Sequence, residues 1–115
     1  MPERIDWLEE FPGGVTLCDR EGTVLFMNRR AGEIFSREGG CSLVGKNLLE
    51  CHPEPARTKL KGMLESGKGN AYTIEKGGKK KLIYQSPWYR EGVYSGFVEL
   101  SLEIPETMAN FVRKG

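Results

Sequence analysis

The sequence has one histidine, no long apolar run and no excess of either charge, and each absence removes a class of function. Its 115 residues carry 17 lysines and arginines against 16 acidic residues, a net charge of +1. This balance argues against electrostatic binding of nucleic acid or of an anionic membrane. No apolar stretch approaches the length of a membrane span. The first residues contain no apolar signal region, so we expect a cytoplasmic protein.

Catalytic and metal-binding patterns are equally scarce. The single imidazole, His52, has no paired acid to activate a nucleophile, and no phosphate-binding glycine motif occurs. The cysteines, Cys18, Cys41 and Cys51, are odd in number and lack the spacing of a disulfide framework, so we expect free thiols. We therefore expect a protein that is not an enzyme and holds no structural metal.

The most informative segment comes early in the chain. Two short strand-like runs surround residues 19–22, Asp-Arg-Glu-Gly, which have the composition of a tight turn. The second run stops at Asn28, whose side chain can cap a helix. Ala31, Ile34 and Phe35 then follow at helical spacing. This order predicts a hairpin that leads directly into a small helix.

The middle of the chain predicts a longer helix. We expect a loop over residues 36–42, an apolar connector over residues 43–49, and a helix opened by Cys-His-Pro-Glu-Pro at positions 51–55, since prolines are tolerated in a first turn. Its apolar stripe is Ala56, Leu60, Met63 and Leu64, and Gly67 ends it.

The last third predicts three antiparallel strands, over residues 72–75, 81–89 and 94–104. In the last strand Gly96, Val98, Leu100 and Leu102 share one face and Ser95, Glu99, Ser101 and Glu103 the other, with Phe97 breaking the polar face. We expect an α+β domain over residues 13–104, with a five-stranded antiparallel sheet and helices packed on one face. A helical segment over residues 1–12 precedes it. A C-terminal tail over residues 105–115 follows and includes a helical turn at 106–112.

With these features in view, the chain resembles a PAS domain. The resemblance runs from about Phe11 to Ile104 and is carried by the turn at residues 19–22, by Asn28 with Ala31 and Phe35, by Leu-Val-Gly-Lys-Asn-Leu at 43–48, and by Tyr-Ser-Gly-Phe-Val at 94–98. Cys51-His52-Pro53 is similar to a subgroup of bacterial PAS domains. The resemblance implies a stand-alone sensor of signal transduction that binds a small molecule or pairs with another copy.

The family's usual linker to an output domain is replaced here by Ser-Leu-Glu-Ile-Pro at 101–105. Unless the chain is an excised part of a longer protein, we therefore expect any output to pass through a separate signalling partner protein.

Several residues have both a functional and a plain structural interpretation. His52 is either an axial haem ligand, as in haem-binding PAS sensors, or a capping or solvent-facing histidine. Chelation through Cys51 and His52 lacks the three or four ligands that a metal needs. Cys51 near a helix start can serve as a redox thiol, whereas Cys18 in a strand is an inert buried one. The cofactor therefore stays unknown.

A pocket is expected between the sheet and the longest helix. If Ile83 faces inward, alternation places Gln85 on the same side, where a buried amide requires a partner. The predicted ligand-binding residues are Phe35, Leu48, His52, Leu60, Met63, Ile83, Gln85 and Val98, and Leu64 is expected beside them.

The opposite face of the sheet predicts an interface, because it gathers apolar residues where water would favour polar ones. Trp7 and Leu8 are expected to cover it, within the monomer or across a homodimer. The predicted dimer-interface residues are Trp7, Leu8, Leu82, Tyr84, Trp88 and Phe97. Lysines 76, 79, 80 and 81 surround a Gly-Gly turn and are expected to be a solvated hairpin tip, not a nucleic-acid site.

Two hypotheses follow. The first is a cytoplasmic sensor whose pocket takes a small ligand or haem and shifts dimer contacts. The second is a ligand-free interaction module that works by pairing and has a filled core.

Overall fold

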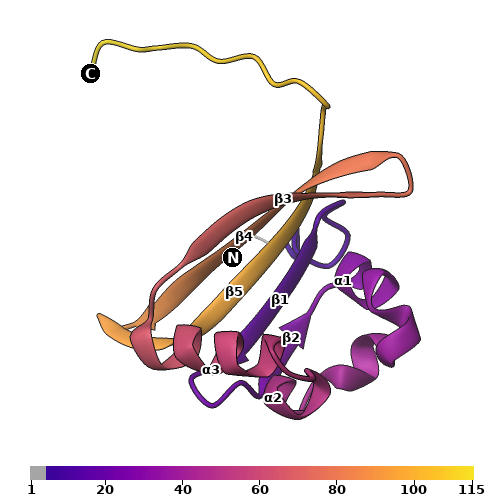
Figure 1. Cartoon of the computed structure of the whole chain (residues 1–115), viewed down its shortest axis with the longest axis vertical. Helices are drawn as coiled ribbons and strands as arrows, with labels where there is room; N and C mark the ends of the chain where they lie inside the picture. Colours follow the sequence, from indigo (N-terminus) through magenta and orange to yellow (C-terminus); the bar gives the residue numbers. More distant parts are fainter. Residues whose placement is uncertain (1–4) are drawn as a thin grey trace.

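The structure, a computed structural model, describes residues 5–115 and consists of one sheet with helices on one of its faces (Figure 1). The strands are β1 (Gly14–Asp19), β2 (Val24–Met27), β3 (Asn70–Lys76), β4 (Lys79–Arg90) and β5 (Val93–Ile104). Between β2 and β3 lie α1 (Arg29–Ile34), two short 3-10 helices at Ser36–Glu38 and Gly40–Leu43, α2 (Leu48–Cys51) and α3 (Ala56–Ser66). This is the predicted α+β class.

The strand order is β2-β1-β5-β4-β3, and every neighbouring pair is antiparallel. The first and last strands of the chain are therefore neighbours at the centre, with Gly14 opposite Ser101 and Asp19 opposite Gly96. Figure 1 shows β1 and β5 side by side, with α3 and α2 across their lower ends. The predicted five-stranded sheet is confirmed.

Asn28 is the polar centre of the core and is fully buried. Its Oδ1 accepts hydrogen bonds from the main-chain N–H groups of Val15 and Ala31, both at 3.0 Å. Its Nδ2 donates to the carbonyls of Leu8 and Gly13, both at 2.9 Å. The side chain thus caps α1, as predicted, and also fixes the N-terminal segment to the hairpin.

The long helix starts later than predicted. Leu48–Cys51 form a separate helix, α2, which Asn47 caps by accepting from the N–H of Leu49 at 2.8 Å. Residues 52–55 are a link, and α3 begins at Ala56. The predicted stop is confirmed: Gly67 caps α3 in the left-handed conformation that glycine adopts without strain. The expected loop at residues 36–42 is mostly 3-10 helix.

The helical predictions at both ends of the chain are wrong for the described residues. Residues 5–12 contain only a turn, because the carbonyl of Leu8 accepts from Asn28 and that of Glu9 accepts from the N–H of Arg29. Residues 1–4 lie outside the described part. Beyond Pro105 the chain forms neither helix nor strand and extends away from the sheet (Figure 1).

The predicted orientation of β5 is also wrong. Phe97 is only 5% exposed and packs with Cys18 and Leu64 on the helix-covered side of the sheet. Side chains alternate along a strand, so Glu99 and Ser101 share this inner face, whereas Val98, Leu100 and Leu102 point to the outer face. Phe97 is therefore a core residue and does not belong to the predicted dimer interface.

Candidate ligand-binding cavity

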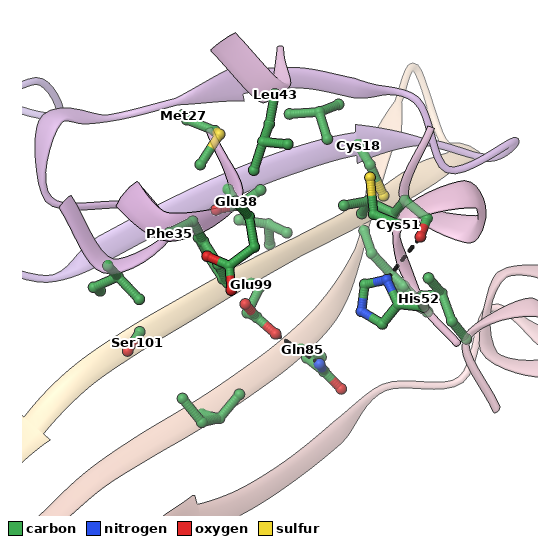
Figure 2. Close-up of a pocket in the computed structure, with 18 of the residues that line it drawn as sticks. Cys18, Met27, Phe35, Glu38, Leu43, Cys51, His52, Gln85, Glu99 and Ser101 are labelled. Carbon is green, nitrogen blue, oxygen red and sulfur yellow. Dashed lines mark hydrogen bonds between the residues drawn. The ribbon is translucent and has the colours of Figure 1, made fainter. Parts of the chain in front are cut away.

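A cavity of about 500 Å³ lies between the inner face of the sheet and the helices. All five strands contribute to its lining, and α1, the 3-10 helices, α2 and α3 cover it. Figure 2 shows part of the lining. This volume is in the range of small-molecule binding sites. The side chains of residues 5–115 leave this space between the sheet and the helices open.

All eight residues predicted to bind a ligand line this cavity: Phe35, Leu48, His52, Leu60, Met63, Ile83, Gln85 and Val98. Val98 borders it although alternation directs its side chain to the outer face. Leu64, which was expected beside them, packs instead in the core with Cys18 and Phe97. Contact of these residues with a ligand stays a prediction.

Most polar residues of the lining were not predicted from the sequence. The unpredicted ones are Thr16, Glu38, Tyr72, Lys76, Lys81, Glu99 and Ser101. The missed signal is Phe97. A large aromatic residue between polar neighbours identifies the core-facing side of β5, and Glu99 and Ser101 then follow by the period of two.

A hydrogen-bonded pair forms the polar centre of the floor. The Gln85 Nε2 donates to Glu99 Oε1 at 2.8 Å across the β4–β5 ladder, where the two residues are directly opposite (Figure 2). Ser101 and Ile83 form the next opposed pair on the same face. The predicted inward orientation of Ile83 and Gln85 is confirmed, and the partner that the buried amide requires is Glu99.

His52 lies in the link after α2, at the edge of the cavity (Figure 2). Its Nδ1 is 2.7 Å from the carbonyl oxygen of Leu48. A carbonyl only accepts, so this contact requires a hydrogen on Nδ1 and leaves Nε2 as an acceptor in the neutral ring. The ring is thus held in one orientation by its own helix.

Haem fits this lining poorly. His52 offers a nitrogen of the right kind, but a large apolar macrocycle would rest on a floor that carries Gln85, Glu99 and Ser101. In the described part of the chain, no group of three metal-ligating side chains is gathered in one place.

The environment of the cavity raises two pKa values. Burial raises the pKa of the Cys18 thiol, opposed by a hydrogen bond from the Phe97 main chain. Burial also raises the pKa of Tyr72, and the negative charge of Glu99 adds to the effect. Cys51 borders the cavity too but is exposed.

The predicted interface residues have different environments. Tyr84 is 46% exposed on the outer face, where alternation also places Leu82. Trp88 lies opposite Gly96, and its Nε1 donates to the carbonyl of Cys18 at 2.9 Å, so it is partly engaged within the monomer. Trp7 is 62% exposed and packs edge-on against Phe11, and Leu8 is half-buried.

The lysines at the hairpin tip divide into two pairs. Lys79 makes an ion pair with Glu103 at 3.5 Å, and Lys80 donates to the carbonyl of Glu106 at 3.2 Å. Lys76 and Lys81 border the end of the cavity that lies toward the tip.

The fold is shared with several solved structures. A C-terminal domain from Streptococcus mutans matches with a TM-score of 0.69 and 20% identity, over 84% of this chain and 78% of that one. The Aer2 receptor of Vibrio cholerae, a dual PAS-haem oxygen sensor, matches with a TM-score of 0.58 and 20% identity, over 81% and 95% of the two chains. The PAS domain of Bordetella pertussis BvgS matches with a TM-score of 0.60 and 17% identity, over 86% and 82%.

No family model matches the sequence, and no curated protein does. At these identities the structural likeness shows the fold, which is the PAS fold predicted from the sequence. Separately, none of the helices within residues 5–115 is long and apolar enough to cross a membrane.

Proposed function

We propose that this chain, which has the fold of a PAS domain, is a cytoplasmic sensor module of signal transduction. Its cavity takes a small organic ligand, and the outer face of its sheet passes the signal to a second copy or to a separate partner protein. The proposal includes no catalytic step, because His52 makes its hydrogen bond to a main-chain carbonyl and not to an acid.

The observation that carries the proposal is the cavity with its polar floor. A core built only for stability would be close-packed and would avoid half-buried polar groups. Here an amide and a carboxylate, Gln85 and Glu99, face about 500 Å³ of space beneath the helices. Few precisely placed polar groups in a largely apolar pocket are typical of a ligand site.

The central strand offers a direct route for the signal. Glu99 and Ser101 face the cavity, whereas Val98, Leu100 and Leu102 on the same strand face outward. A ligand that moves the inner side chains of β5 therefore also moves the apolar outer surface.

Native mass spectrometry of gently purified protein, with an absorbance spectrum beside it, tests this function. We expect a bound small organic molecule without the Soret band of haem. The variant Ser101→Leu, which fills the floor of the cavity, should lose the adduct. Ser86→Leu, the same change at an outward position of β4, should keep it.

A protein without any adduct, whose melting temperature also does not respond to a library of small molecules, would contradict the sensor function. The ligand-free interaction module would then be favoured, since the half-exposed Leu82, Val98, Leu100 and Leu102 form an apolar outer surface suited to pairing.

A further inference from the structure

Glu99, the carboxylate at the floor of the cavity, has no cationic partner among residues 5–115. Glu103, on the same face of β5, pairs with Lys79 at 3.5 Å and with Arg30 at 3.6 Å. Within residues 5–115, no lysine, arginine or histidine makes an ion pair with Glu99. Its only hydrogen bond from that part of the chain comes from the neutral amide of Gln85.

The second carboxylate oxygen, Oε2, is accessible. It accepts no hydrogen bond from the described residues. Every fully buried side-chain oxygen of those residues does have a hydrogen-bond partner, so Oε2 is not fully buried. Glu99 Oε2 therefore keeps exposed surface, and Glu99 lines the cavity. A partly buried anion in this position gains most from a charged donor.

The hydroxyls of Thr16, Tyr72 and Ser101, which also line the cavity, can donate or accept, whereas other polar atoms of the lining only accept. Because the Gln85 Nε2 donates to Glu99, the Gln85 Oε1 remains to accept. In the neutral ring His52 donates from Nδ1, so its Nε2 also accepts. Glu38, at the end of the first 3-10 helix, adds a second carboxylate to the lining.

The two lysines of the lining lie at a distance from this group. Lys81 is opposite Glu103, whereas Gln85 is opposite Glu99. The four-residue separation along β4 corresponds to about 13 Å between main-chain positions. Neither Lys76 nor Lys81 makes an ion pair with Glu99.

We propose that the cavity binds a small organic cation of the amine or amidine class. Its N–H groups donate to Glu99 Oε2 and Gln85 Oε1, and its apolar body contacts Phe35, Ile83 and Met63. This inference rests on the proposed function and assigns the chemistry of its ligand. Glu99 is then the residue that makes the cavity prefer a positively charged ligand.

The test compares benzamidinium, benzoate and neutral benzamide as probes, which share a ring and differ in charge. Titrations are followed by amide chemical shifts of the full chain. We expect benzamidinium to move signals of β4 and β5 at the cavity and to bind more tightly than the other two. The variant Glu99→Gln should weaken it about tenfold, the usual scale for a charge-assisted hydrogen bond.

The matched control is Glu103→Gln, which removes the same charge from the same face of β5 outside the cavity lining. It should change benzamidinium affinity less than about twofold. If Glu99→Gln does not fold, the relative affinities of the unaltered chain for the three probes still test the cation assignment. Tighter binding of benzoate or benzamide overturns the cation assignment and leaves the sensor function intact. Absence of binding by all three probes overturns the assignment as well, and the native mass spectrum then decides whether the sensor function also fails.

Discussion

Asn28 shows how one side chain can hold three segments together. It accepts from the main-chain N–H groups of Val15 and Ala31 and donates to the carbonyls of Leu8 and Gly13, of which that of Leu8 also accepts from the N–H of Phe11. We expect Asn28→Ala to lower the free energy of unfolding by about 3 kcal/mol, since it leaves buried groups unpaired.

Urea unfolding measures this loss. The control is Asn70→Ala, which removes only an exposed contact to the N–H of Ala71 and should cost less than about 0.5 kcal/mol. If both variants lowered the free energy of unfolding equally, Asn28 would not be the polar centre of the core.

Cys18 gives the molecule a pH dependence. Burial raises the pKa of this thiol above its ordinary value of 9.0. As the pH rises past 9.0, the unfolded chain loses the proton while the folded chain keeps it, so stability falls with pH. Urea unfolding from pH 8 to pH 10 should show this decline, and Cys18→Ala should make it shallower.

Thiol labelling checks the same environment independently. Cys41 and Cys51 are exposed and should react with a disulfide reagent at once. Cys18 should react only when the protein unfolds. Rapid labelling of all three thiols in the folded protein would contradict the burial of Cys18.

At the scale of elements, two glycines of α3 should respond oppositely to the same substitution. Gly62 lies inside the helix with open space around it, so Gly62→Ala should stabilise the protein by about 0.5 to 1 kcal/mol. Gly67 has a φ of 67° at the helix end, so Gly67→Ala should destabilise it by about 1 kcal/mol.

Thermal melts of the two variants and of the unaltered chain measure the sign of each change in stability. The same sign for both substitutions would mean that Gly67 does not need its left-handed conformation.

The elements that the sequence predicted well are those with local signals. Asn28 and Gly67 each mark a boundary through chemistry within a few residues. The orientation of β5 was not predictable from alternation alone, because a period of two separates the faces without saying which one is covered. The helical segment expected over residues 1–12 is wrong in its described part, because the carbonyls of Leu8 and Glu9 accept from Asn28 and Arg29, contacts that no local pattern reveals.

The candidate site was predicted in its apolar part and missed in its charged part. Phe35, Leu60 and Met63 are apolar residues in predicted helices, so their inward orientation follows from periodicity. Glu99 was placed on the polar face of its strand because alternation groups it with Ser95, Ser101 and Glu103. Glu99 instead faces the cavity, and this position of a charged side chain is what gives information about the ligand.

At the scale of the whole molecule, the sheet has an apolar surface on the side that the helices leave open. We expect the chain to form a homodimer through this outer face, and Tyr84→Glu should shift it to a monomer. Light scattering coupled to size exclusion measures the mass. The control, Val112→Glu, adds the same charge to an exposed apolar residue of the tail. A protein that is monomeric at high concentration without any substitution would contradict this prediction.

The pairing of the first and last strands has a mechanical consequence. Gly14 at the start of β1 lies opposite Ser101 near the end of β5, so the chain segments before β1 and after β5 leave the sheet at the same end of these two strands. A force that pulls these two segments apart would break the β1–β5 hydrogen bonds one after another, starting at that end, instead of loading all of them together. The module would therefore yield to modest tension.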